Sequence, residues 1–291
     1  MNRTLITRKP AWLNKKINLK DLNQTKELLA DLNLNTVCEE ALCPNIGECF
    51  SNGQATFMIL GDVCTRNCRF CGVAKGEPKE VDLDEPLRVA QAVKRLNLKH
   101  VVITSVTRDD LELQGADIFN KVVKEIKENT QAESIEVLIP DFQGKKKLFD
   151  LVIEAKPDVI NHNVETVPAL YNQVRPLANY RVSLEVLRYT KEKDPSIFTK
   201  SGLMLGLGEA DNEVLKVLDD LREVDCDFLT LGQYLNPSKN HYPVVDFITP
   251  EKFEEYKEEA LKRGFKFVAS APYVRSSYKA REALETVKNN I

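Results

Sequence analysis

The stretch of sequence that decides the fold is TFMILGDVCTRNCRFC, residues 56–71. It opens with Thr56–Leu60, a short apolar run that is typical of a buried strand. Three cysteines follow directly, Cys64, Cys68 and Cys71, in the spacing C-x3-C-x2-C. Three thiols cannot pair as disulfides without a leftover, whereas all-sulfur ligand sets bind zinc, copper(I) or an iron–sulfur cluster. Because a cluster of four irons held by three cysteines keeps one iron open, the triplet indicates a reactive site.

A second cysteine triplet precedes this strand and consists of Cys38, Cys43 and Cys49, spaced C-x4-C-x5-C. The two triplets contain six of the seven cysteines; the last, Cys226, is interpreted as a small buried apolar residue. Structural zinc sites normally have four protein ligands and favour C-x2-C pairs, so iron–sulfur ligation fits better than the zinc alternative. Clustered thiols without an apolar secretory signal also indicate a reducing compartment, and we expect a cytoplasmic protein.

Composition narrows the class of protein. The chain has 291 residues, of which 43% are hydrophobic, and its net charge is −3. This charge argues against nucleic acid as the main partner. No apolar run approaches the roughly 20 residues that a membrane span requires, so we expect no membrane partner either.

Apolar runs alternate with amphipathic helical patterns from about residue 56 onward. The predicted strands are Thr56–Leu60, His100–Thr104, Ile135–Ile139, Val159–Asn163, Leu203–Leu205 and Phe228–Leu231. The predicted helices are Glu85–Asn97, Ala116–Asn129, Lys145–Ala155, Asn179–Tyr189 and Glu213–Val224. The alternation predicts an α/β fold, a parallel sheet with right-handed crossovers. A full eight-stranded barrel needs about 250 residues, so we expect a partial (β/α)6 barrel of the TIM type.

Three segments are expected along the chain. Residues 1–54 form an N-terminal extension with one cysteine triplet, residues 55–250 form the partial barrel, and residues 251–291 form a C-terminal extension. The C-terminal extension is predicted to hold a strand, Lys266–Ser270, and a helix, Ser277–Asn289.

Polar residues cluster where the predicted strands end, which is where barrels of this kind carry their reactive groups. After the second strand stand Ser105 and Arg108–Asp110, and after the fourth stand Asn161–Asn163 and Glu165. For the run Arg108–Asp110, a solvated turn and a binding role remain open. Gly206–Glu209 follows a strand and is interpreted as a strand-to-helix turn, since it lacks the full phosphate-loop pattern.

The two triplets in context resemble one known family. VCEEALCPNIGECF at residues 37–50, followed by CTRNCRFC at 64–71, is similar to the lipoyl synthases, a family within the radical S-adenosylmethionine superfamily. Matching stretches follow in the same order: KPAWL (9–13), ITSVTRDDL (103–111), HNVETVP (162–168), TKSGLMLGLGE (199–209), FLTLGQYLNPSKNHYPV (228–244) and VRSSYKA (274–280). Two stretches depart from the family, Leu113–Gly115 and the SAPY at 270–273, and neither contains a proposed ligand.

The resemblance implies two 4Fe–4S clusters and S-adenosylmethionine as cofactors. Cys64, Cys68 and Cys71 would hold the cluster that chelates S-adenosylmethionine. Cys38, Cys43 and Cys49 would hold an auxiliary cluster, with Ser277 as an unusual fourth ligand and Ser276 as the less favoured choice. Residues expected to contact S-adenosylmethionine are Phe70, Thr104, Ser105, Asn163 and Glu165, and the turn at Gly206–Glu209 is expected to line the same pocket. Without the resemblance, the two serines read as a helix N-cap.

The resemblance also implies the reaction, a sulfurtransferase reaction that inserts sulfur at carbons 6 and 8 of an octanoyl chain on a carrier lysine. Two S-adenosylmethionine molecules would be consumed per lipoyl group, the auxiliary cluster would donate sulfur, and no catalytic side chain is expected beyond the clusters. Implied partners are octanoylated lipoyl domains, in the glycine cleavage H protein and in 2-oxoacid dehydrogenase acyltransferase subunits, and an electron donor such as ferredoxin or flavodoxin.

Two other functions are weighed against this one. The first is another two-cluster radical enzyme, such as a methylthiotransferase acting on transfer RNA, which would favour a basic RNA-binding module that the sequence does not show. The second is an electron carrier, but ferredoxins supply four ligands per cluster and use small folds.

Overall fold

The computed structural model describes residues 9–13, 22–41, 43–51 and 55–288, and all structural statements concern these residues. The chain forms two compact units. The N-terminal unit comprises residues 16–67 and 72–160, and the C-terminal unit comprises residues 1–15, 68–71 and 161–291. Within the three predicted segments, residues 1–8, 14–21, 42, 52–54 and 289–291 lie outside the described part of the chain.

The N-terminal unit is built on a sheet whose neighbouring strands are, in order, β1 (Asn35–Thr36), β2 (Thr56–Ile59), β5 (His100–Ser105), β6 (Ser134–Leu138) and β7 (Val159–Asn161). β2 pairs with β5 and β5 with β6 in parallel, so that Met58 lies opposite Thr104 and Thr104 opposite Leu138. Every residue of β2 is buried, as expected for a strand covered on both faces. β1 adds an antiparallel edge to β2, which the sequence did not predict because a two-residue strand has no readable period.

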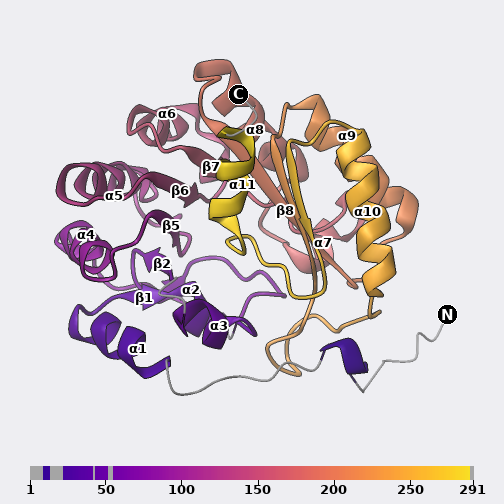
Figure 1. Ribbon diagram of the computed structural model, residues 1–291, viewed down its shortest axis with the longest axis horizontal. Coiled ribbons are helices and arrows are strands. Elements are labelled where there is room, and N and C mark those ends of the chain that lie inside the picture. Colours follow the sequence, from indigo (N-terminus) through magenta and orange to yellow (C-terminus); the bar gives the residue numbers. More distant parts are fainter. Residues whose placement is uncertain (1–8, 14–21, 42, 52–54, 289–291) are drawn as a thin grey trace. The chain divides into compact units, whose positions relative to one another are not determined.

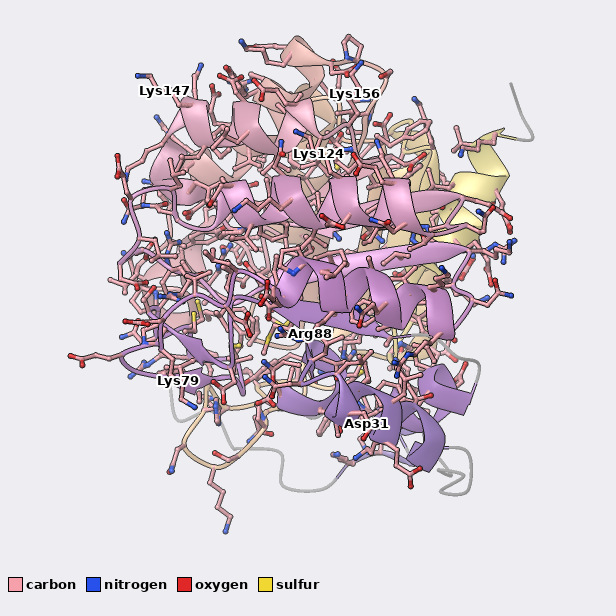
Figure 2. All side chains as sticks on the ribbon, turned by 90° about the vertical axis from the view of Figure 1, so that its left-hand side faces the viewer. Asp31, Lys79, Arg88, Lys124, Lys147 and Lys156 are labelled. Atoms are coloured by element: carbon pink, nitrogen blue, oxygen red, sulfur yellow. The ribbon has the colours of Figure 1, made fainter. Side chains whose placement is uncertain are left out.

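Three helices pack along one side of this sheet (Figure 1). They are α4 (Glu85–Arg95), α5 (Ala116–Asn129) and α6 (Lys146–Glu154). Their inner faces are apolar, and Phe142 contacts both Phe119, at a ring-centroid distance of 6.5 Å, and Phe149, at 6.0 Å. Their outer faces are charged, with Lys124 and Lys147 exposed to solvent (Figure 2). The helices are therefore amphipathic, as the sequence period predicts.

Short elements complete the N-terminal unit. They are α1 (Leu22–Asp31), α2 (Val37–Glu40), α3 (Ile46–Ser51), the parallel pair β3 (Val63–Cys64) and β4 (Ala74–Lys75), and the 3-10 turn η2 (Phe142–Gly144).

The C-terminal unit contains three parallel strands, β8 (Phe198–Leu205), β9 (Phe228–Gln233) and β10 (Phe267–Ser270), adjacent in that order. Its helices are η1 (Ala11–Leu13), η3 (Pro168–Leu170), α7 (Tyr171–Val174), α8 (Tyr180–Lys193), α9 (Asp211–Glu223), α10 (Pro250–Lys262) and α11 (Ala280–Lys288). A continuous apolar core joins strands and helices, and Leu205, Leu218, Leu231 and Phe253 in it are fully buried. The predicted strand Lys266–Ser270 thus belongs to the parallel sheet.

β8 is much longer than the predicted strand Leu203–Leu205. It begins at Phe198 because Thr199, Lys200 and Ser201, which look like loop residues in the sequence, are buried in the strand. Thr199 N–H donates to Asp227 Oδ2 at 2.9 Å, and Ser201 Oγ donates to the His162 carbonyl at 2.9 Å. Buried polar groups that find such partners lose little free energy, so polar residues do not mark the end of this strand.

Two other predicted boundaries are wrong. β7 ends at Asn161 rather than Asn163, and only an isolated bridge between Glu165 and Leu203 follows it. The last helix begins at Ala280 rather than Ser277, because Lys279 has φ 56°, a left-handed conformation outside the helical region. The α/β class with a mostly parallel sheet is confirmed. No helix in the described part of the chain is long and apolar enough to cross a membrane.

Candidate functional site

The upstream cysteine triplet gathers in the N-terminal unit. Cys38 lies in α2, Cys43 in the loop that follows, and Cys49 in α3. The N–H of Cys43 donates to the Cys38 carbonyl at 3.0 Å. Burial, together with the charges of Cys43 and Cys49, raises the pKa of the Cys38 thiol to about 12, although hydrogen bonds from Thr56 oppose the shift. The Cys38 thiol is therefore in the neighbourhood of both Cys43 and Cys49.

Cys64 ends β3, and the loop that follows it is hydrogen-bonded to the segment after β5. Its sulfur accepts two backbone hydrogen bonds, from Arg66 N–H and from Thr107 N–H, each at 3.4 Å. The N–H and the hydroxyl of Thr65 both donate to the Thr107 carbonyl, at 3.1 Å and 2.9 Å. The loop after Cys64 and the segment after β5 therefore both supply backbone N–H groups to this sulfur.

Arg66 ties the same loop to two further carboxylates. Its guanidinium forms ion pairs with Asp109 and Asp141, each at 2.7 Å. Sequence reasoning left Arg66 and Asp141 unassigned, although Arg66 lies inside the cysteine motif and Asp141 follows a predicted strand. For Asp109, the sequence left two roles open, a solvated turn and a binding residue. In the structure Asp109 anchors the cysteine loop through Arg66. Its neighbour Arg108 pairs instead with Asp110 at 2.8 Å.

Cys68 and Cys71 form a tight turn that belongs to the C-terminal unit. Cys71 N–H donates to the Cys68 carbonyl at 3.3 Å. Between them, Arg69 N–H donates to the Val174 carbonyl at 2.8 Å and the Arg69 carbonyl accepts from Tyr242 N–H at 2.8 Å. Two loops of this unit therefore hold the turn through its backbone.

Two side chains support this turn. His241 hydrogen-bonds the Cys71 carbonyl through Nε2 at 3.1 Å and Ser238 Oγ through Nδ1 at 2.8 Å. Phe70, expected to contact S-adenosylmethionine, packs against an apolar cluster made of Val174, Leu207, Tyr234 and Val244. Phe70 thus has a packing role that holds the turn in place.

Two predicted contact residues lie at the end of β5. Thr104 is 5% exposed, and its hydroxyl donates to the Leu138 carbonyl at 3.0 Å. Ser105 Oγ is buried and has no hydrogen-bond partner in the part of the chain that the structure describes. An unmet buried hydroxyl costs free energy, so Ser105 is the better placed of the two to bind a ligand.

Asn163 and Glu165, the predicted contacts after β7, are neighbours in the C-terminal unit. Asn163 Nδ2 donates to Glu165 Oε1 at 3.1 Å and to Ser276 Oγ at 2.5 Å, while Arg175 Nη1 donates to the Asn163 carbonyl at 3.0 Å. Burial raises the pKa of Glu165, although the Arg175 charge and the Asn163 hydrogen bond lower it. Asn163 Oδ1 is buried and has no partner among the described residues, which leaves an acceptor for a ligand.

The VRSS segment, residues 274–277, packs on the end of β9. A Cβ at Gly232 would overlap the Val274 carbonyl, so only glycine permits this approach. Gln233 N–H donates to the Pro272 carbonyl at 3.2 Å and fixes the approach of the segment. Ser277 is half-buried in the C-terminal unit. Because α11 begins at Ala280, neither Ser276 nor Ser277 occupies the N-cap position immediately before it.

The turn at Gly206–Glu209 binds its own side chain. Glu209 Oε1 accepts from Gly206 N–H at 2.5 Å, and Oε2 accepts from Leu207 N–H at 2.9 Å. Gly206 has φ 96°, and a Cβ there would overlap the Asp246 carbonyl. The segment is a strand-to-helix turn, as predicted. Because the N–H groups of Gly206 and Leu207 already donate to Glu209, they are not available to bind a phosphate.

The donor sets fit the cofactors that the sequence predicts. The six triplet cysteines are thiols rather than disulfides. No three His, Cys, Asp or Glu side chains among the described residues are placed to enclose one metal ion. A four-iron cluster distributes its ligands over several metal atoms. Ser105 Oγ and Asn163 Oδ1 are buried oxygens without a hydrogen-bond partner among the described residues.

Comparisons with known proteins agree with these features. The Radical SAM superfamily model matches residues 58–221, and membership of that superfamily implies a 4Fe–4S cluster and S-adenosylmethionine. A lipoyl synthase of Caldicellulosiruptor saccharolyticus is 57% identical over 97% of this chain and 99% of its own length. A lipoyl synthase of Alkaliphilus metalliredigens is 58% identical over 96% of this chain and 97% of its own.

Solved structures support the fold. Methylornithine synthase has a TM-score of 0.54 at 13% identity and covers 91% of this chain and 92% of its own. SuiB of Streptococcus suis bound to S-adenosylmethionine has a TM-score of 0.57 at 11% identity, over 77% of this chain and 53% of its own. These likenesses confirm the predicted barrel class of fold. Identity above 50% over nearly the full length shows more, and the chain belongs to the lipoyl synthase family of the radical S-adenosylmethionine superfamily.

Proposed function

We propose that this protein is a sulfurtransferase that inserts two sulfur atoms, at carbons 6 and 8, into an octanoyl group carried on a protein lysine. The observation that carries the proposal is the presence of two cysteine triplets on one chain, at 38–49 and 64–71. A radical enzyme needs one such triplet to generate its radical. The second triplet is then available as the source of sulfur.

The residues of the two triplets would hold two 4Fe–4S clusters. Cys64, Cys68 and Cys71 would hold the first and leave an iron open for S-adenosylmethionine. Cys38, Cys43 and Cys49 would hold the second, which Ser277 would complete. When bound, these groups supply a radical that removes hydrogen from unactivated carbon, and the sulfur that replaces it. An oxygen ligand among thiolates is the ligand most readily released, which gives Ser277 its role.

The polar residues at the strand ends would bind S-adenosylmethionine. Ser105 and Asn163 each present a buried oxygen that lacks a partner among the described residues. Glu165 lies 3.1 Å from Asn163 Nδ2 and presents a carboxylate beside it. Phe70, which packs the cysteine turn, and Thr104, whose hydroxyl bonds the Leu138 carbonyl, would also contact the cofactor.

Octanoylated lipoyl domains are the proposed protein substrates, in the glycine cleavage H protein and in 2-oxoacid dehydrogenase acyltransferase subunits. Ferredoxin or flavodoxin would supply electrons, two S-adenosylmethionine molecules would be consumed per lipoyl group, and the reaction would take place in the cytoplasm. The division into segments 1–54, 55–250 and 251–291 remains a proposal.

The direct test mixes anaerobically reconstituted, reduced protein with S-adenosylmethionine and an octanoyl-lysyl peptide. We expect 5′-deoxyadenosine and a peptide that carries two additional sulfur atoms, from a protein that holds about eight iron atoms per chain. A peptide without octanoate is the control for uncoupled cleavage of S-adenosylmethionine. Protein with a single cluster, or with zinc, would overturn the proposal.

A further inference from the structure

Arg66 is buried between two carboxylates inside the cysteine motif. Its side chain is 6% exposed, and that of Asp141 is 3% exposed. Nε and Nη2 donate to the two oxygens of Asp109, at 2.7 Å and 2.9 Å. Nη1 and Nη2 donate to the two oxygens of Asp141, at 2.8 Å and 2.7 Å. The guanidinium therefore makes two forked pairs, the arrangement that its planar geometry favours.

These contacts link the cysteine loop to the ends of two strands. Asp109 follows β5 and Asp141 follows β6, so the network spans neighbouring strands of the N-terminal unit. Asp109 N–H also donates to Thr65 Oγ1 at 3.1 Å. A guanidinium stays charged in proteins, so opposite charges on Asp109 and Asp141 hold the loop from two sides.

The backbone of the same loop delivers the two N–H groups that reach Cys64. One comes from Arg66 itself and the other from Thr107, two residues before Asp109. Any movement of Arg66 would shift the first N–H directly and the second through Asp109. The positions of the two N–H groups that bond the Cys64 sulfur therefore depend on the ion pairs of Arg66.

We propose that Arg66, with Asp109 and Asp141, is a positioning residue that sets the two N–H···S hydrogen bonds on Cys64 and thereby the reduction potential of the cluster bound there. N–H donors stabilise the more negatively charged, reduced cluster, so they raise its potential. The proposal rests on the proposed function, because it requires a cluster at Cys64.

The test measures the midpoint potential of the cluster whose electron paramagnetic resonance signal changes when S-adenosylmethionine is added, in full-length, cluster-loaded protein. Arg66→Lys keeps the charge but cannot form two forked pairs. Asp109→Asn and Asp141→Asn keep the shape but remove one charge each. Asp110→Asn is the matched control, because Asp110 is adjacent and pairs with Arg108 instead.

We expect Arg66→Lys to shift the potential to a more negative value and to speed hydrogen–deuterium exchange of peptides covering residues 64–67 and 107. Asp110→Asn should leave both measurements at the wild-type values. The double variant Arg66→Lys/Asp109→Asn should shift the potential by less than the sum of the single shifts, because the residues act through one contact. Loss of the S-adenosylmethionine-responsive cluster from Arg66→Lys alone would also support the positioning role.

Wild-type potentials in Arg66→Lys and in both Asp variants would overturn this inference, and so would additive shifts in the double variant. Failure of the proposed function looks different. In that case the wild-type protein itself would hold no cluster that responds to S-adenosylmethionine, whatever the variants do.

Discussion

Asn163 Nδ2 lies 2.5 Å from Ser276 Oγ, which joins the loop after β7 to the segment before α11 within the C-terminal unit. Asn163 is a proposed contact of S-adenosylmethionine, and Ser276 is adjacent to Ser277, the proposed ligand of the auxiliary cluster. One hydrogen bond thus connects the residues proposed for radical generation with those proposed for sulfur donation.

Ser276→Ala removes this hydrogen bond and leaves Ser277 in place. The bond contributes about 1 kcal/mol, so we expect an approximately fivefold lower yield of thiolated peptide per 5′-deoxyadenosine at unchanged iron content. The ratio of the two products, measured by mass spectrometry, checks this. Ser196→Ala is the control, because Ser196 is exposed and its hydroxyl donates to the nearby Asp194 Oδ1, and it should keep the wild-type ratio. An unchanged product ratio in Ser276→Ala would show that this hydrogen bond does not couple radical generation to sulfur donation.

Cys43→Ala separates the roles of the two triplets. We expect this variant to keep cleaving S-adenosylmethionine, because Cys64, Cys68 and Cys71 are intact, and to lose sulfur insertion altogether. Cys226→Ala is the matched control, since Cys226 is buried two residues before β9 and outside both triplets, and it should retain both activities. If Cys43→Ala alone lost the cleavage reaction, the roles of the two clusters would be reversed.

Gly206 and Gly61 provide a matched pair of backbone substitutions. Their φ angles are 96° and 94°, so alanine meets similar backbone strain at both, about 1–2 kcal/mol. A Cβ at Gly206 also overlaps the Asp246 carbonyl, whereas a Cβ at Gly61 meets nothing within 4 Å. We therefore expect Gly206→Ala to lose roughly 1–3 kcal/mol more than Gly61→Ala, measured as the free energy of unfolding in urea. Equal losses would show that the turn can relax around the new methyl group.

Glu85 gives the protein a predictable pH dependence. It is 4% exposed, accepts Leu60 N–H at 2.8 Å, and burial raises its pKa above the usual value of about 4.5. Its protonated form favours the folded state, so its contribution to stability is complete below pH 4.5 and is lost as pH rises through the raised pKa. Glu85→Gln keeps the acceptor and does not ionise.

The stability of Glu85→Gln relative to wild type should therefore increase from pH 4.5 upward and then level off. Urea unfolding of both proteins, run side by side without oxygen, measures this difference and cancels effects of the clusters. A difference that is constant with pH would contradict the raised pKa of Glu85.

The sequence by itself determined the ligand types, their spacing and the alternation of strands and helices. Spacing along the chain fixes which thiols can share a cluster, and apolar periodicity is a local property, so α5 was predicted at Ala116–Asn129 without error. Periodicity did not predict the start of β8, because Thr199, Lys200 and Ser201 are buried there and depend on hydrogen-bond partners from other segments.

Only the tertiary structure decided which polar groups meet. Arg66 and Asp141 are 75 residues apart, and Asn163 and Ser276 are 113 apart, so no local pattern could pair them. Such contacts form because parallel strands end at the same edge of a sheet and bring their following loops together. The sequence therefore determines the chemistry that the chain can perform, and the fold determines which side chains hold that chemistry in position.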